Sequence, residues 1–251
     1  MNNKELSLDI TFLFPNTMST YGDSGNILAL KKRCEWRGVE AFIHYCDIYD
    51  SIYPSDIYFW GGGQDIAQEI VSNNFSQQKI DFLNNEVEKS KVFLLICGSY
   101  QLMGKYYIDS NGNKIEGLGI LDVYTKSSPK RMIGNVVIET NKKLKLGNKK
   151  IIGFENHSGQ TFLGKGVEPF GYVKIGFGNN GFDKTEGVIY KNVIACYLHG
   201  PLLPKNPHLT DYIILKALEN KYDSNVTLQK LDDSLELKAF NTLLNRLKIQ
   251  S

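Results

Sequence analysis

The first half of the chain alternates strand-like and helix-like segments, and this pattern constrains the fold more than any other feature. Residues 8–14 (LDITFLF) have the composition of a strand. Residues 23–38 place apolar side chains on one helical face and end at a glycine. The same reasoning predicts strands at 39–45, 56–60 and 92–96 and a helical region at 65–90. Such alternation is typical of a parallel sheet with right-handed crossovers.

The second half has a different pattern. Short strand-like pieces separated by turn residues indicate antiparallel pairing. These predicted strands are 135–140, 150–156, 172–178, 187–192 and 193–198, and two helices are predicted near 208–221 and 231–249. In the last helix, Leu237, Phe240, Leu244 and Leu247 form a stripe expected to face the core. We therefore expect residues 1–251 to form a single α/β domain, with a mostly parallel, flavodoxin-like central sheet flanked by helices and an antiparallel extension.

Composition narrows the functional classes. The 29 basic and 27 acidic residues nearly cancel, which argues against a nucleic-acid surface, and the basic run 142–150 is expected to be a solvated hairpin. No apolar run reaches membrane-spanning length, and Asp9 interrupts the first one, so neither a spanning helix nor a secretory signal is expected. The four cysteines lack CxxC spacing, which fits a reducing cytoplasm and a nucleophile rather than a disulfide.

One cysteine is placed where a nucleophile would be. Cys97 follows the wholly apolar strand 92–96 (VFLLI) and precedes Gly98, with a helix predicted immediately after. A strand-to-helix turn at the carboxyl edge of a parallel sheet holds a side chain open to ligand. The positive end of the helix would favour a thiolate. The alternative is a buried structural cysteine, and the local sequence alone leaves both open.

Two further segments support the nucleophile. Residues 61–63 are three glycines after a predicted strand, a pattern that lets backbone N–H groups approach a ligand. His199 ends the predicted strand 193–198 and is followed by Gly-Pro, so it can reach a nucleophile on a neighbouring strand. Of the other histidines, His44 is expected in a strand, on the other face or the rim of the sheet, and His208 at a helix start. His157 is expected in a loop hydrogen-bond network, with a place in the pocket as its alternative.

Together these motifs resemble class I glutamine amidotransferases, and most closely the cobyric-acid-synthase-like branch. Within that branch the chain is similar to the glutaminase subunits of lipid II isoglutaminyl synthases. The segments that carry the resemblance are YGDSGNILALKKR (21–33), GGGQD (61–65), CGSYQLMG (97–104), GFENHSGQT (153–161) and YLHGPLLPKNP (197–207).

The resemblance implies that the enzyme hydrolyses glutamine to glutamate and ammonia. Cys97 would attack the side-chain amide, and His199 would move the protons. Backbone N–H groups near Gly62 and at Gly98 would stabilise the oxyanion.

Two further side chains receive substrate-binding roles from the resemblance. Gln101 lies one helical turn after the nucleophile and would help to hold the substrate. Arg131, in SPKRMIGN, would anchor glutamine, because a guanidinium suits a carboxylate; the alternative is a surface residue of a basic loop.

The sequence departs from the family pattern at one position. Most class I enzymes have a glutamate two residues after the histidine, whereas this chain has Pro201. A backbone carbonyl, a distant residue such as Glu155, or a carboxylate lent by a partner subunit could orient His199 instead. We favour the partner, because glutamine hydrolysis would then wait for an ammonia acceptor.

The chain lacks the GxxxxGK[ST] phosphate loop, so activation of a carboxylate by ATP is expected elsewhere. By resemblance, a separate Mur-ligase-like synthetase binds ATP and Mg²⁺ and amidates the D-glutamate α-carboxylate of lipid II. This chain would then need no cofactor and no metal, and the complex would act in the cytoplasm at the inner membrane face. Three alternatives remain: an amidotransferase subunit for a corrinoid or other cofactor precursor, a stand-alone γ-glutamyl hydrolase or cysteine peptidase, and a catalytically silent regulatory subunit.

Overall fold

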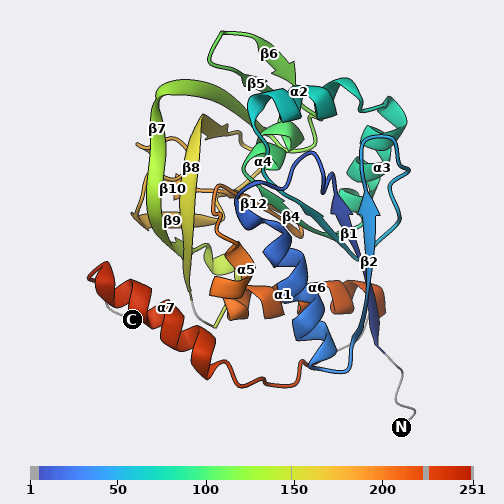
Figure 1. Ribbon diagram of the computed structural model, residues 1–251, viewed down its shortest axis with the longest axis vertical. Coiled ribbons are helices and arrows are strands. Elements are labelled where there is room, and N and C mark those ends of the chain that lie inside the picture. Colours follow the sequence, from blue (N-terminus) through green and yellow to red (C-terminus); the bar gives the residue numbers. More distant parts are fainter. Residues whose placement is uncertain (1–5, 148, 223–225, 250–251) are drawn as a thin grey trace.

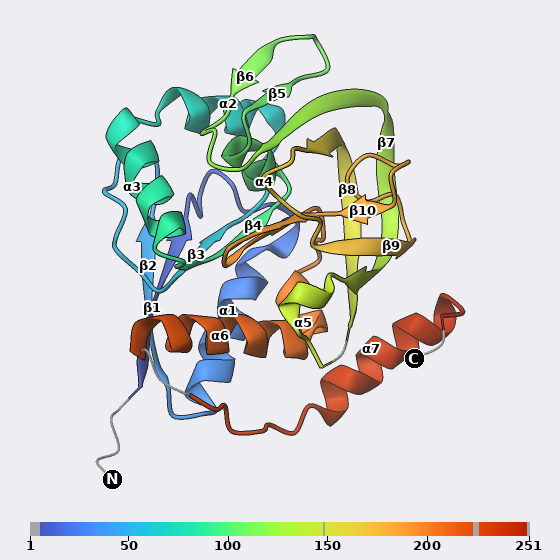
Figure 2. The same ribbon diagram turned by 180° about the vertical axis from the view of Figure 1, so that it is seen from behind.

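The computed structural model describes residues 6–147, 149–222 and 226–249. Its two sheets, the helices around them and both ends of the chain are seen in Figures 1 and 2. The strands are β1 (Ser7–Leu13), β2 (Glu40–Cys46), β3 (Ile57–Trp60), β4 (Val92–Ile96), β5 (Tyr106–Ile108), β6 (Lys114–Glu116), β7 (Val123–Thr140), β8 (Lys150–Leu163), β9 (Gly171–Ile175), β10 (Thr185–Glu186), β11 (Val188–Tyr190) and β12 (Val193–Cys196). The α-helices are α1 (Ser24–Glu35), α2 (Asp65–Asn73), α3 (Gln77–Glu88), α4 (Gly98–Met103), α5 (Leu202–Lys205), α6 (Pro207–Tyr222) and α7 (Ser234–Arg246).

The first sheet has the strand order β11-β12-β4-β3-β1-β2. All neighbouring strands in it are parallel except the edge strand β11, which runs antiparallel to β12. Every residue of β4 is buried, as expected of a central strand with helices on both faces. The predicted α/β class with a mostly parallel sheet is therefore confirmed.

Alternate side chains of these strands pack against different helices. On β1, Leu8, Ile10 and Phe12 join one apolar cluster that includes residues of α1 and α6. On β3, Tyr58 and Trp60 join a second cluster that includes residues of α2, α3 and α4. The sheet is thus the middle layer of three, and both clusters contact the partly buried Cys97 at its carboxyl edge.

The second sheet is the predicted antiparallel extension, with the order β10-β9-β7-β5-β6 and β8 paired to β7. Its long strands β7 and β8 curve past the carboxyl edge of the first sheet (Figure 1). The prediction for β12 was only partly right: it pairs antiparallel with β11, but it pairs in parallel with β4 and belongs to the first sheet. Parallel insertion beside β4 brings the end of β12 to the same edge as the end of β4.

The region predicted as one helical stretch is two helices. α2 ends at Asn73, and Ser76 caps α3 by accepting a hydrogen bond from the Lys79 backbone N–H (3.3 Å). A serine before a helical run is a typical N-cap, because its side-chain oxygen satisfies an otherwise free N–H group.

The C-terminal helix α7 buries only part of its predicted stripe. Phe240 and Leu244 pack with Val137 and Ile152 of the second sheet, whereas Leu237 is 41% exposed. A salt-bridge network connects the residue before α7 to α1 and α6. Its members are Arg33, Arg37, Asp211 and Asp233.

Two histidines and the basic run were also assigned positions from the sequence. His44 lies on the edge strand β2 and contacts Asp9, and His208 is the second residue of α6, as predicted. The basic run 142–150 connects β7 to β8, with a short 3₁₀ turn at 142–144; residue 148 lies outside the described residues. Within the described part of the chain, no helix has the length and apolar character needed to cross a bilayer.

Candidate active site

Cys97 occupies the predicted elbow between β4 and α4. Its backbone has φ 56° and ψ −102°, a conformation that costs a non-glycine residue about 1–3 kcal/mol. Its N–H donates to the Cys196 carbonyl (2.8 Å), which ties the end of β4 to the end of β12. The thiol lines a cavity of about 310 Å³. The strained turn therefore holds the sulfur at the wall of an open cavity, whereas the other three cysteines are buried.

Gly98 is required for close approach of two loops. A Cβ atom at this position would lie 2.9 Å from both the backbone N and the backbone O of Gly63. The elbow therefore packs directly on the backbone of the glycine run.

His199 follows β12 and lies behind the cavity wall. Its backbone pairs with Phe154 of β8 in both directions, so it is held between the two sheets. The ring is 1% exposed, and Tyr21 packs edge-on against it with 5.0 Å between ring centroids. The Nδ1 atom lies 3.2 Å from Asp23 Oδ1, and Nε2 has no hydrogen-bond partner among the described residues. Nε2 is therefore the nitrogen that remains for the thiol.

The carboxylate beside His199 comes from Asp23, in the loop before α1. Asp23 is fully buried, and its Oδ2 accepts a hydrogen bond from the Gly62 N–H (2.7 Å). Asp23 was not predicted, because the residues next to His199 include no acid and a carboxylate from a partner subunit was favoured. The available signal was the YGDSGN segment, which follows the first predicted strand at the carboxyl edge where Cys97 lies.

Glu155, the distant residue suggested from the sequence, does not orient His199. Its carboxylate accepts hydrogen bonds from the backbone N–H groups of Phe177 (2.7 Å) and Gly178 (2.9 Å). It also lies 3.7 Å from His157 Nε2. Glu155 therefore stabilises the second sheet and does not orient His199.

The electrostatic environment of His199 favours its protonated form. Burial lowers its pKa, but the Cys97 thiolate and the Asp23 carboxylate raise it to about 10. Proton transfer from the thiol to the imidazole is thus assisted by the charges on both sides of the ring.

The role predicted for Gly62 needs correction. Its N–H is directed at Asp23, so it is not available to a substrate oxygen. A Cβ atom at Gly62 would lie 2.8 Å from His199 Cε1, so this glycine makes room for the imidazole. The next residue, Gly63, lines the cavity.

Gln101 lies in the cavity wall, one turn after Cys97, as predicted. Its Nε2 donates to the Tyr197 hydroxyl (3.2 Å), which shares a further hydrogen bond with Thr161 (2.5 Å). The side-chain carbonyl is left as the acceptor end of the amide. A Cβ atom at Gly159 would lie 2.2 Å from Gln101 Nε2, so that glycine permits this close contact.

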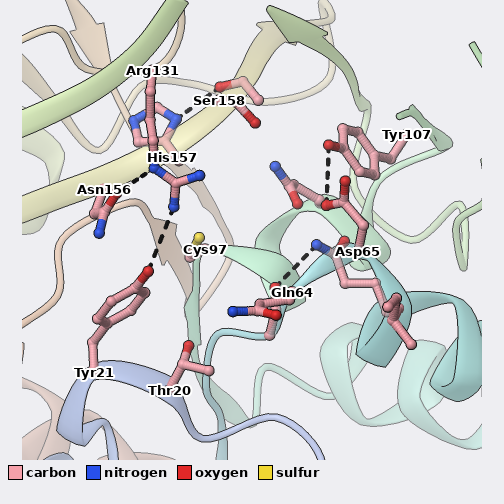
Figure 3. Close-up of a pocket in the computed structure, with 15 residues that line it drawn as sticks. Thr20, Tyr21, Gln64, Asp65, Cys97, Tyr107, Arg131, Asn156, His157 and Ser158 are labelled. Atoms are coloured by element: carbon pink, nitrogen blue, oxygen red, sulfur yellow. Dashed lines mark hydrogen bonds between the residues drawn. The ribbon is translucent and has the colours of Figure 1, made fainter. Parts of the chain in front are cut away.

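Arg131 lies in β7 rather than in a loop, beside an irregularity in the pairing with β8 between Ser127 and Met132. Its Nε donates to Asn156 Oδ1 (2.6 Å), and a terminal nitrogen lies 3.5 Å from the Tyr21 hydroxyl. Figure 3 shows the guanidinium at the cavity, near Cys97. Its donors are therefore accessible from the cavity in which the thiol lies.

His157 belongs to the cavity wall, although we expected a loop position. It lies in β8, its Nδ1 bonds with the Gly159 carbonyl (2.7 Å), and its ring stacks on Tyr197 at 3.6 Å. The hydrogen bond agrees with the favoured prediction and the pocket position with its stated alternative, whereas a place in a strand was not predicted. Among the described residues, no group of three or more His, Cys, Asp or Glu side chains is arranged to hold a metal ion.

A family model, the CobB/CobQ-like glutamine amidotransferase domain, matches residues 9–207. The chain belongs to this family. The predicted family and branch are therefore confirmed, and with them the assignment of the chain as a glutamine amidotransferase.

Similar proteins of near-equal length are known. Two are named lipid II isoglutaminyl synthase (glutamine-hydrolyzing) subunit GatD. The Streptococcus pneumoniae protein is 38% identical over 93% of this chain and 89% of its own length. The Staphylococcus aureus protein is 39% identical over 95% and 96%, respectively. A probable cobyric acid synthase of Methanocaldococcus jannaschii is 30% identical over 78% of this chain but only 40% of its own. A solved glutamine amidotransferase of Thermotoga maritima has the same fold, with a TM-score of 0.54, 14% identity and coverage of 97% and 94%.

Proposed function

We propose that this amidotransferase hydrolyses L-glutamine and passes the ammonia to a separate, ATP-dependent, Mur-ligase-like synthetase that amidates the D-glutamate α-carboxylate of lipid II. The observation that carries the proposal is the arrangement of Cys97, His199 and Asp23 beside one cavity. The names and matching lengths of the two bacterial relatives support lipid II as the target of the partner.

The hydrolysis proceeds through a thioester. The Cys97 thiolate attacks the side-chain amide carbon, and the His199 imidazolium gives its proton to the departing nitrogen. The C–N bond breaks, ammonia leaves, and a glutamyl thioester remains. His199 then removes a proton from water as it attacks the thioester, and returns that proton to the sulfur as glutamate leaves.

The oxyanion formed at each step needs donors at the carboxyl edge of the sheet. We assign this role to the backbone N–H groups of Gly98 and Gly63, because Gly63 lines the cavity and its backbone lies against Gly98. Gly62 contributes indirectly, by holding Asp23.

Asp23 takes the place of the glutamate that most class I enzymes carry after the histidine. It holds Nδ1 so that Nε2 faces the thiol, and it stabilises the imidazolium. The position of the usual acid is occupied by Pro201, whose ring lies against Gly25: a Cβ atom there would be only 2.5 Å from Pro201 Cγ. Pro201 therefore packs against the start of α1, the helix that follows Asp23. A carboxylate from the partner is not needed to orient the histidine.

The partner supplies the energy of amide formation. ATP and Mg²⁺ bind to the synthetase, which activates the acceptor carboxylate. Ammonia is mostly protonated in neutral water, so a shielded passage between the two subunits is expected. The heterodimer would then work in the cytoplasm, at the membrane face that carries the lipid-linked substrate.

The test is co-expression with a Mur-ligase-like synthetase, followed by an assay of lipid II amidation. We expect Cys97→Ala to abolish amidation driven by glutamine and to leave amidation driven by ammonium chloride unchanged. Cys46→Ala, which removes a buried thiol away from the cavity, is the matched control. Loss of both reactions, or of neither, would contradict the proposal.

A second assay separates the alternatives. Labelling of Cys97 by 6-diazo-5-oxo-norleucine is expected, and a silent regulatory subunit would not react. Amidation of a corrinoid instead of lipid II by the purified complex would favour the cofactor pathway. Full turnover by the lone chain, unchanged by the synthetase, would favour a stand-alone hydrolase.

A further inference from the structure

The cavity in front of Cys97 has ends of opposite charge. Arg131 lies at one end, and Asp65 with Tyr107 at the other, as Figure 3 shows. L-Glutamine carries a carboxylate and an ammonium group on the same carbon. A cavity that recognises the free amino acid therefore needs a cation for one group and acceptors for the other.

Asp65 is held in position at the end of the cavity where the ammonium group of the substrate is expected. It is in the first turn of α2, directly after the glycine run and Gln64. The Tyr107 hydroxyl donates to Asp65 Oδ1 (3.2 Å), and Tyr107 itself is 1% exposed. This bond uses Oδ1 and leaves Oδ2 as an acceptor.

Gln68 lies one turn later on the same helix and lines the same cavity. It is 2% exposed, and its Nε2 donates to the Gly63 carbonyl (3.2 Å). Its Oε1 is buried and has no hydrogen-bond partner among the described residues. A buried acceptor without a donor is costly, so such an atom in a cavity wall points to a ligand donor.

We propose that Asp65 and Gln68 bind the α-ammonium group of L-glutamine and thereby restrict the enzyme to the free amino acid. The inference rests on the proposed glutaminase function. An ammonium group has three N–H donors and no acceptor, which matches a carboxylate and an amide carbonyl. Arg131 binds the α-carboxylate, and the side-chain amide reaches Cys97. Glutamine blocked at its nitrogen in a peptide lacks the charge that Asp65 requires.

A competing explanation for Asp65 is helix stabilisation. An acidic residue in the first turn of a helix interacts favourably with the helix dipole. Such a role would change stability, but it would not change which substrate is preferred. Glu69 lies on the same helix and is exposed, so it provides a matched removal of charge.

The experiment compares three substrates with the synthetase complex. L-Glutamine carries both groups, glutaramic acid lacks the ammonium, and 4-aminobutanamide lacks the carboxylate. The variant Asp65→Asn keeps an acceptor for Tyr107 but removes the charge. Release of ammonia gives kcat/KM for each pair, and the ratio between substrates within one variant does not depend on how much enzyme is folded.

We expect Asp65→Asn to lower kcat/KM for L-glutamine about 10- to 100-fold, mainly by raising KM. This fold-change is the one expected for loss of a charge-assisted hydrogen bond. Activity on glutaramic acid should stay the same, so the preference for glutamine over it disappears. Arg131→Gln should instead erase the preference for glutamine over 4-aminobutanamide. Glu69→Gln should leave all ratios unchanged.

Equal losses on L-glutamine and glutaramic acid in Asp65→Asn, or unchanged selectivity, would overturn the ammonium subsite and leave the glutaminase proposal intact. A wild-type complex that releases no ammonia from L-glutamine would contradict the proposed function itself. The two failures are thus distinguished by the wild-type measurement.

Discussion

The two sides of the cavity are built differently. On the side of the first sheet, Asp23 and His199 are 0% and 1% exposed, and hydrogen bonds fix both. On the other side, which we call the recognition side, Arg131 reaches the cavity from the exposed face of β7 and Asp65 from the start of α2. Proton transfer requires fixed groups in a medium of low dielectric, whereas capture of a charged amino acid requires groups that water and ligand can reach. The comparison predicts that substitutions of Asp23 or His199 lower kcat, whereas substitutions of Arg131 or Asp65 raise KM.

The largest effect is expected for Asp23→Asn. The amide keeps the shape of the carboxylate but loses its charge and can fix the wrong tautomer of His199. We expect kcat to fall about 10²- to 10⁴-fold, with little change in KM. Because Asp23 helps to raise the pKa of His199 to about 10, the alkaline limb of the pH–rate profile should move to lower pH.

The control is Asp81→Asn, an exposed aspartate of α3. Steady-state kinetics with L-glutamine, measured with the synthetase bound, gives kcat and KM for both variants. A variant with normal kcat would mean that a group outside this chain orients the imidazole.

The second effect concerns Glu186, a buried acid of β10 in the second sheet that takes part in no step of the proposed reaction. Burial raises the pKa of Glu186 to about 8, from 4.5, while its carboxyl group accepts a hydrogen bond from the Tyr197 N–H (2.6 Å). The unfolded chain releases this proton first as the pH rises, so stability is lost between these two pKa values. From pH 5 to pH 7 the wild type should lose about 2–3 kcal/mol of unfolding free energy relative to Glu186→Gln.

Urea unfolding of both proteins at the two pH values tests this expectation. The substrate preference of Glu186→Gln should match that of the wild type. Parallel pH profiles for the two proteins would show that Glu186 is ionised in the folded chain.

The smallest effect is expected on the recognition side. Arg131→Gln should raise KM for L-glutamine about 10-fold and change kcat less than threefold, because it removes one charge-assisted contact to the carboxylate. Lys130→Gln, an exposed neighbour in β7, is the control. A fall in kcat with normal KM would place Arg131 with the catalytic groups and remove the distinction between the two sides.

Local signals in the sequence predicted the parallel sheet well. β4 has the predicted bounds, because an apolar run of five residues is delimited by Lys91 and by Cys97-Gly98. β7 was predicted only for its last six residues. It has 18 residues, and Pro129, Lys130 and Arg131 in its first half do not resemble a strand. Its first half is paired with β8 around an irregularity, which is a tertiary effect.

The positions of the candidate site residues were predicted where a motif is local and missed where it is not. Cys97, His199 and Gly98 follow from strand ends and glycines. Asp23 lies 176 residues before His199, so the identity of the residue that completes the site depends on how α1 packs. The difference between Gly62 and Gly63 depends on the direction of one peptide N–H, which residue types do not specify.

The insertion of β12 beside β4 has a consequence for synthesis. Cys97 and Asp23 leave the ribosome long before residues 193–199, yet the imidazole reaches the sulfur only after β12 has joined the sheet. A nascent or truncated polypeptide thus contains the nucleophile without its base. Glutamine hydrolysis by this subunit can therefore begin only after residues 193–199 have been translated and β12 has joined the first sheet.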